Sequence, residues 1–172
     1  MIRKATAQDL CVISDIYEAI HSCEEQGLTT IGWIRGVYPT ASTARASLER
    51  DDLFVEEIAG EIVAAAIINQ TQVPVYADAA WKHPAPDEEV MVLHTLTVSP
   101  CHTGHGYGKQ FVTFYEQYAL EHGCHYLRMD TNVINKNARR LYQTLGYAEI
   151  GIVPCEFNGI PGVQLVCLEK KL

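Results

Sequence analysis

The residues with the clearest chemical meaning are three closely spaced glycines, Gly104, Gly106 and Gly108. They follow an apolar, β-rich run from Val90 to Val98 and precede a segment with helical periodicity. A strand, a glycine loop and a helix in this order leave several backbone N–H groups free at the helix N-terminus, where the helix dipole is positive. Glycine also lets an anion approach the backbone closely because it has no Cβ. The segment therefore predicts a phosphate-binding loop.

Two common phosphate-loop patterns do not fit these residues. A Walker loop requires glycine at position 103 and serine or threonine at position 110, where this chain has Thr103 and Gln110. A dinucleotide fingerprint requires a third glycine at position 109, which is Lys109 here. The pattern that fits is Gln/Arg-x-x-Gly-x-Gly/Ala, with Thr103 in the first place and Gly106 and Gly108 as the glycines. It resembles the acetyl-coenzyme A loop of the GNAT superfamily of N-acetyltransferases.

A second segment resembles another part of the same superfamily. Residues Asn135 to Tyr147 read Asn-x-x-Ala-x-x-Leu-Tyr-x-x-x-Gly-Tyr, which is similar to the GNAT signature that ends in Gly-Phe. A short β-like run from Tyr126 to Thr131 lies between the two motifs. Because both motifs occur in the family's order and at its separation, the chain is identified as a member of the superfamily. The resemblance is strong over roughly Glu89 to Ile150.

The order of strand-like and helix-like segments predicts an α/β fold, more narrowly an α+β mixed sheet. The expected helices cover Asp9–Glu25, a segment capped by Ser42 or Thr43 and ending about Arg50, about Gly106–Glu121, and Asn135–Leu145. The expected strands cover residues 2–6, Leu53–Ala59, Glu61–Gln70, Val90–Val98, Tyr126–Thr131, Tyr147–Val153 and Val163–Lys170. Three connections remain: the polar Gln26–Thr40, the proline-rich Gln72–Glu88, which we expect to border a binding site, and the short, turn-rich Asn158–Gly162.

The resemblance adds detail to this fold. It implies a central, mainly antiparallel sheet flanked by about four helices, forming one domain over residues 1–172. It also implies that the fourth and fifth strands separate beyond Val98 and Thr131, so that a thioester can enter between them.

Composition excludes several classes of protein. The formal charge of −8 argues against nucleic-acid binding, which needs a broad basic face, and no apolar run approaches the length of a membrane span. The six cysteines form no CxxC pair and the N-terminus has no apolar signal segment, so we expect reduced thiols and a cytoplasmic location. His122 and His125 lie where side chains should diverge, and no zinc-like spacing occurs, so no metal is expected.

The resemblance implies acetyl-CoA as co-substrate and assigns its contacts. The backbone of the fourth strand would pair with the pantetheine arm, the glycine loop would hold the pyrophosphate, and the start of the fourth helix would meet the cofactor. The residues so assigned are Leu96, Thr97, Val98, Thr103, Gly104, His105, Gly106, Tyr107, Gly108, Lys109, Asn135 and Ala138. Asn135 could equally serve as a helix N-cap. Further cations near the phosphates would come from Lys109, Lys136, Arg139 or Arg140.

Direct attack of an amine on a thioester needs a base, oxyanion donors and an acid for the leaving thiolate. Tyr142 matches the family tyrosine that protonates the sulfur, although a buried core aromatic is the alternative. Asp130 on the fifth strand is the first candidate base and His94 on the fourth is the second, because imidazole titrates near neutrality. Glu88 and Glu89 come third. Asp130 could instead orient the following loop, and His94 could be a hydrogen-bonded core histidine.

The acceptor side is the least specified part of the sequence. Trp33 and Tyr38, in the connection Gln26–Thr40, could cover the acceptor pocket or merely anchor local packing. The sequence predicts an N-acetyltransferase that moves an acetyl group to a primary amine of a small molecule or peptide, with a homodimer as one possible assembly. A catalytically inactive acyl-CoA sensor and a transferase of longer acyl groups are the alternatives.

Overall fold

The structure, a computed structural model, describes all residues from 1 to 172. One seven-stranded sheet runs through the molecule in the order β1-β2-β3-β4-β5-β7-β6. All neighbouring strands are antiparallel except β4 and β5, which are parallel. The strands are β1 (Ile2–Lys4), β2 (Leu53–Ile58), β3 (Glu61–Asn69), β4 (Val90–Val98), β5 (Tyr126–Asn132), β6 (Ala148–Phe157) and β7 (Ile160–Lys171). The expected α+β mixed sheet is confirmed.

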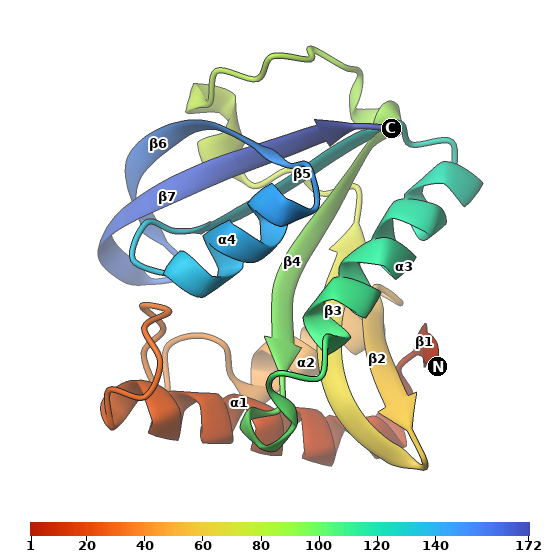
Figure 1. Cartoon of the computed structure of the whole chain (residues 1–172), viewed down its shortest axis with the longest axis vertical. Helices are drawn as coiled ribbons and strands as arrows, with labels where there is room; N and C mark the ends of the chain where they lie inside the picture. Colours follow the sequence, from red (N-terminus) through yellow and green to blue (C-terminus); the bar gives the residue numbers. More distant parts are fainter.

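Four helices cover the two faces of this sheet (Figure 1), namely α1 (Leu10–Glu25), α2 (Ala41–Glu49), α3 (Tyr107–Glu121) and α4 (Lys136–Thr144). The apolar sides of α1 and α2 pack on β2 and β3 from one side, through residues such as Ile13, Tyr17 and Ala44. The apolar sides of α3 and α4 pack on the other side, where the largest buried cluster forms. Burying apolar surface on both faces supplies the main driving force for this arrangement.

Two boundaries differ from the sequence expectation. Helix α2 begins after Thr40 rather than Ser42, and Thr43 lies in its first turn, where its hydroxyl accepts a hydrogen bond from the Thr40 N–H at 3.0 Å. The β6–β7 hairpin has a two-residue turn at Asn158 and Gly159, with φ of 52° and 77°. Two positive φ values match the twist of a tight hairpin, so residues 160–162 join β7 rather than a loop.

The parallel pair β4 and β5 separates part-way along its length. Pairing runs from Val90 opposite Tyr126 to Leu93 opposite Met129 and then stops. The separation that the resemblance implied is confirmed, but it begins about five residues earlier on β4 than Val98. Figure 1 shows the two strands side by side at one end and spread apart at the other, with α4 beside the gap.

An irregularity in β4 explains the early separation. On the β3 side, Ala65 pairs with Thr97 and Ile67 pairs with His94, so β4 carries one extra residue there. Thr95 lies in this bulge with φ of 52°, a conformation that β-branched residues rarely adopt. A bulge bends its strand and increases the local twist, which turns β4 away from β5.

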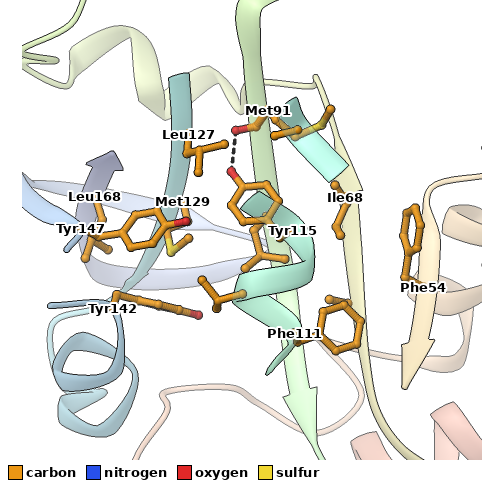
Figure 2. Packing of buried hydrophobic residues seen from close by; sticks show 14 of the residues in the cluster. Phe54, Ile68, Met91, Phe111, Tyr115, Leu127, Met129, Tyr142, Tyr147 and Leu168 are labelled. Carbon is orange, nitrogen blue, oxygen red and sulfur yellow. Dashed lines mark hydrogen bonds between the residues drawn. The ribbon is translucent and has the colours of Figure 1, made fainter. Parts of the chain in front are cut away.

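A buried tyrosine fixes the strands just before they part. The Tyr115 hydroxyl, on α3, lies 2.6 Å from the backbone oxygen of Met91 on β4 and 3.2 Å from that of Arg128 on β5. Figure 2 shows the Tyr115 ring packed among the buried residues of this cluster, with Met91 at the end of its hydroxyl. Tyr115 is fully buried, so this contact anchors α3 at the point where the sheet opens.

Candidate active site

A cavity of about 140 Å³ lies where β4 and β5 separate. Its wall is contributed by β4, β5, β7, α4, the turn of the β6–β7 hairpin, the connection between α1 and α2, and Val73 from the connection between β3 and β4. Eight residues singled out from the sequence line it: Trp33, Tyr38, His94, Leu96, Asp130, Asn135, Ala138 and Tyr142. The fold thus brings together side chains that are up to about a hundred residues apart in the chain.

Asp130 supplies the only formally acidic side chain of the cavity wall. Its Oδ2 accepts a hydrogen bond of 2.7 Å from the Tyr76 hydroxyl, while Oδ1 receives no hydrogen bond and the carboxylate has no cationic partner. Burial raises the pKa of Asp130 to about 6, and the Tyr76 hydrogen bond opposes part of that rise. Asp130 is therefore a carboxylate that can hold or release a proton near neutral pH.

Tyr76 is a site residue that the sequence analysis did not identify. It lies in a short 3₁₀ turn, η2 (Pro74–Asp78), inside the proline-rich connection, and only 3% of its surface is exposed. Trp81 packs against Tyr76: the two rings meet edge to face with their centroids 5.0 Å apart, and the Trp81 indole N–H donates a hydrogen bond of 2.9 Å to the Tyr76 carbonyl. The long connection therefore borders the site by fixing the tyrosine that contacts Asp130.

His94 reaches the cavity from β4 but in an unfavourable state for accepting a proton. Its Nε2 lies 3.1 Å from the Asn69 side-chain oxygen, and burial lowers the pKa of His94 to about 4. The sequence argument assumed an imidazole that titrates near neutrality. Burial in the sheet removes that property, because a low-dielectric environment disfavours the charged ring.

Tyr142 lies on α4 between the core and the cavity. It is 7% exposed, and its ring meets that of Tyr147 edge to face at 6.1 Å, as Figure 2 shows. Its hydroxyl forms no hydrogen bond within the chain, although the residue lines the cavity. Burial, reinforced by the Asp130 charge, raises the pKa of the Tyr142 hydroxyl, so it stays protonated across the physiological range.

The start of α4 lies on the same cavity wall. Asn135 caps the helix, since its side-chain oxygen accepts a 3.2 Å hydrogen bond from the Ala138 N–H, and both residues line the cavity. The capping role considered in the sequence analysis is therefore present.

The end of β4 leaves one strand edge without a partner. Leu96 lines the cavity, while the buried Thr97 hydroxyl donates to the Ala65 carbonyl at 3.0 Å and Val98 packs on the main cluster. Beyond Leu93 the edge of β4 that faced β5 has no strand beside it. Backbone donors and acceptors there are available to a ligand.

The glycine loop follows β4 immediately and does not line the cavity. It includes a 3₁₀ turn, η4 (Pro100–His102), and Gly106 caps α3 in the left-handed conformation at φ of 82°. The backbone N–H groups from Thr103 to Lys109 form no hydrogen bond within the chain. Seven consecutive free donors at a helix N-terminus suit an anion such as a pyrophosphate.

The expected cations near this loop differ in availability. Arg139 is bound to Glu149 through two contacts of 2.7 and 2.8 Å and also donates to the Val133 carbonyl. The side chains of Lys109, Lys136 and Arg140 are exposed and form no hydrogen bond or ion pair, so they remain free to meet a ligand.

Other sequence candidates lie elsewhere. Glu88 and Glu89 precede β4, at the end where β4 and β5 are paired, and neither lines the cavity. No group of three or more His, Cys, Asp or Glu side chains is arranged to hold a metal ion. None of the helices is both long and apolar enough to span a bilayer.

Comparison with known proteins agrees with this geometry. The family model for the acetyltransferase (GNAT) family matches residues 14–147, which is most of the chain. This chain belongs to the GNAT family. It is an acetyltransferase, and the family uses acetyl-CoA and acts on amine acceptors. A search of the curated proteins found no match to its sequence.

Solved structures share the fold at low identity. A GNAT-family acetyltransferase from Streptococcus agalactiae superposes with a TM-score of 0.83 at 21% identity, covering 100% of this chain and 95% of that one. A putative acetyltransferase from Salmonella typhimurium, solved with its cofactor acetyl-CoA, gives 0.72 at 19% identity over 100% and 93%. The ribosomal-protein-S18-alanine N-acetyltransferase from Escherichia coli gives 0.69 at 15% identity over 99% and 92%.

The buried carboxylate makes folding stability depend on pH in a defined direction. The folded-state pKa of Asp130, about 6, exceeds the ordinary value of 3.8. Ionised Asp130 therefore destabilises the fold fully above about pH 6, and this penalty disappears below the unfolded-state pKa of about 4. Asp130→Asn retains an acceptor for Tyr76 and removes the charge, so its Tm should exceed that of wild type by about 3–8 °C at pH 8 and by little at pH 4.

Thermal melts of both proteins across pH 4–8 provide the measurement. The matched control is Asp15→Asn, because Asp15 is exposed on α1 and has no hydrogen bond or ion pair. Equal Tm differences at pH 4 and pH 8 would show that Asp130 is not a buried, ionising group.

Proposed function

We propose that this chain transfers an acetyl group from acetyl-CoA to a primary amine by direct attack in a complex that holds both substrates. The acceptor is the amine of a small molecule or a peptide. One observation carries this proposal: a free carboxylate oxygen of Asp130 and the unpartnered Tyr142 hydroxyl belong to one cavity, at the opening between β4 and β5. That opening continues into the glycine loop with its free N–H groups.

Asp130 is our choice of general base. The acceptor arrives as an ammonium ion, which must lose a proton before its nitrogen can attack. Above about pH 6 Asp130 is ionised, and its free Oδ1 can take this proton directly or through water. His94 is less suited because its lowered pKa makes it a much weaker base.

Tyr142 is our choice of general acid. In the reaction one C–N bond forms, one C–S bond breaks, and the departing thiolate must receive a proton. The Tyr142 hydroxyl is protonated at working pH and has no competing partner in the chain. The ammonium group loses two protons on becoming an amide, one to Asp130 before attack and one from the tetrahedral intermediate. Tyr142 gives one proton to the sulfur and recovers it from solvent, so each turnover releases one net proton to solvent.

The unpaired edge of β4 and the glycine loop are our choice for binding acetyl-CoA. Backbone donors beyond Leu93 can pair with the amide groups of the arm and polarise the carbonyl, which needs no particular side chain. The loop donors from Thr103 to Lys109 suit the pyrophosphate, with Lys109, Lys136 or Arg140 adding local positive charge.

Acetyl-CoA should stabilise the folded chain and do so through the loop. At about a hundred times its Kd it should raise Tm by roughly 5–10 °C. Thr103→Glu places a carboxylate beside the free N–H groups and should abolish most of this shift, whereas the neutral Thr103→Gln should keep or enlarge it. Thr103 has an extended backbone and an exposed side chain, so neither change strains the fold.

Differential scanning fluorimetry with isothermal calorimetry measures both effects. If wild type shows neither a thermal shift nor heat at millimolar acetyl-CoA, the proposal fails at its first step. Equal shifts for Thr103→Glu and Thr103→Gln would place the phosphates away from this loop.

Tyr142→Phe separates catalysis from binding. The change removes one hydroxyl and keeps the ring packing, so acetyl-CoA affinity should be unchanged while kcat falls about tenfold to a thousandfold. The control is Tyr118→Phe, since Tyr118 lies on α3, packs on Phe54 and has no hydrogen bond from its hydroxyl. Both kinetic constants come from a free-thiol release assay with intact-mass confirmation of the product.

The result also decides between enzyme and sensor. An unchanged kcat in Tyr142→Phe would make Tyr142 a core residue only. Binding of acetyl-CoA without turnover of any amine, in either protein, would instead support the catalytically inactive sensor.

A further inference from the structure

The cavity wall carries a single charged side chain. Among the residues that line it, Asp130 is the only one charged at neutral pH, since no lysine or arginine is present and His94 is neutral. A carboxylate or phosphate on the acceptor would find no counter-ion here. Burying such an anion beside Asp130 would be strongly unfavourable.

Much of the remaining cavity wall consists of apolar side chains. The β6–β7 hairpin and the start of β7 contribute Phe157, Ile160, Val163 and Leu165, and the connection between α1 and α2 contributes Trp33 with Tyr38. The Trp33 and Tyr38 rings meet edge to face at 6.0 Å, and the Tyr38 hydroxyl is occupied by a hydrogen bond with the Thr95 side chain. Together with uncharged polar side chains such as Asn132 and Asn158, they surround Asp130 with a wall that carries no second charge.

The α1–α2 connection and the hairpin turn also contact each other beside this part of the cavity. A Cβ at Gly32 would lie 2.5 Å from the Asn132 side-chain nitrogen, and a Cβ at Gly159 would lie 3.3 Å from Val37. Gly32 therefore lies against Asn132 at the end of β5. Gly159, in the hairpin turn, lies against Val37 of the α1–α2 connection. Figure 1 shows the connection after α1 rising toward the end of the β6–β7 hairpin. An extended peptide has little room to pass through such a cover.

The cavity volume sets the size of the group that fits. About 140 Å³ is close to the roughly 150 Å³ of an apolar cavity that accommodates benzene. Because the acetyl thioester must share this volume, one six-membered ring is the upper size limit for an acceptor body held in the cavity with its amine directed at Asp130.

Resting on the proposed function, we propose that the acceptor is a small monoamine: one primary ammonium group on an uncharged apolar body of about ring size. Asp130 binds the ammonium group and the walls around Trp33 and Phe157 bind the body. Amino acids, phosphorylated amines, polyamines and protein N-termini are excluded by charge or by size.

Three ring-bearing amines test the role of charge at nearly constant shape. 2-Phenylethylamine has no substituent beside the amine, phenylalaninamide carries a neutral one, and phenylalanine carries a carboxylate of similar size. The kcat/KM for 2-phenylethylamine should exceed that for phenylalanine at least about a hundredfold, with phenylalaninamide in between. Butylamine should exceed 1,4-diaminobutane and an alanine-starting hexapeptide by at least about tenfold.

Two variants test the wall itself. Trp33→Ala should reduce the preference for 2-phenylethylamine over butylamine, because the aromatic wall is lost. Val73→Arg adds a cation at the half-buried rim of the cavity and should raise the phenylalanine rate relative to 2-phenylethylamine, whereas the neutral Val73→Gln should not. Melts of each variant confirm that it folds.

The outcomes test the acceptor class separately from the proposed acetyl transfer. Equal or faster acetylation of phenylalanine, the polyamine or the hexapeptide overturns the acceptor class and leaves the transferase intact. If no amine turns over, calorimetric titration of the acetyl-CoA-loaded chain with the three ring-bearing amines still decides. Tighter binding of 2-phenylethylamine than of phenylalanine supports the inference, and equal or weaker binding contradicts it.

Discussion

The departure of β4 from β5 after Leu93 and Met129 is the constraint on which the rest of the site depends. In a sheet interior every backbone donor and acceptor is normally paired, so opening two central strands is unfavourable unless other contacts compensate. The Thr95 bulge forces the opening at a cost of about 1–3 kcal/mol for its left-handed backbone. The Tyr115 contact with Met91 and Arg128 limits how far it extends.

The opening also determines where the chemical groups can meet. Asp130 projects from one sheet face, where Tyr76 binds it, and Tyr142 approaches from α4 on the other face. In a closed sheet the backbone ladder would separate these two groups. With β4 displaced, both line one cavity. The same displacement leaves a free strand edge that leads into the glycine loop. The positions of the proposed catalytic groups and of the proposed cofactor-binding groups therefore both depend on the separation of β4 from β5.

The sequence was sufficient for most helices and strands and for the glycine loop, because these depend on local periodicity and on glycine spacing. The separation of the central strands and the place of Asn135 and Tyr142 at the site came from the resemblance to the family, not from local patterns. Features that depend on tertiary contacts could not be predicted from the sequence. No pattern marks Tyr76 as the partner of Asp130, since 54 residues separate them. A β-branched Thr95 at positive φ contradicts local preference, and the lowered pKa of His94 arises only from burial.

The most direct test of this account is a crystal structure of the chain with coenzyme A. The account predicts that the pyrophosphate accepts hydrogen bonds from the N–H groups between Thr103 and Lys109. It also predicts that the arm follows the free edge of β4 and that the sulfur lies in the cavity with Asp130 and Tyr142. A coenzyme bound elsewhere, or β4 and β5 paired beyond Leu93 with the sulfur outside the cavity, would contradict it.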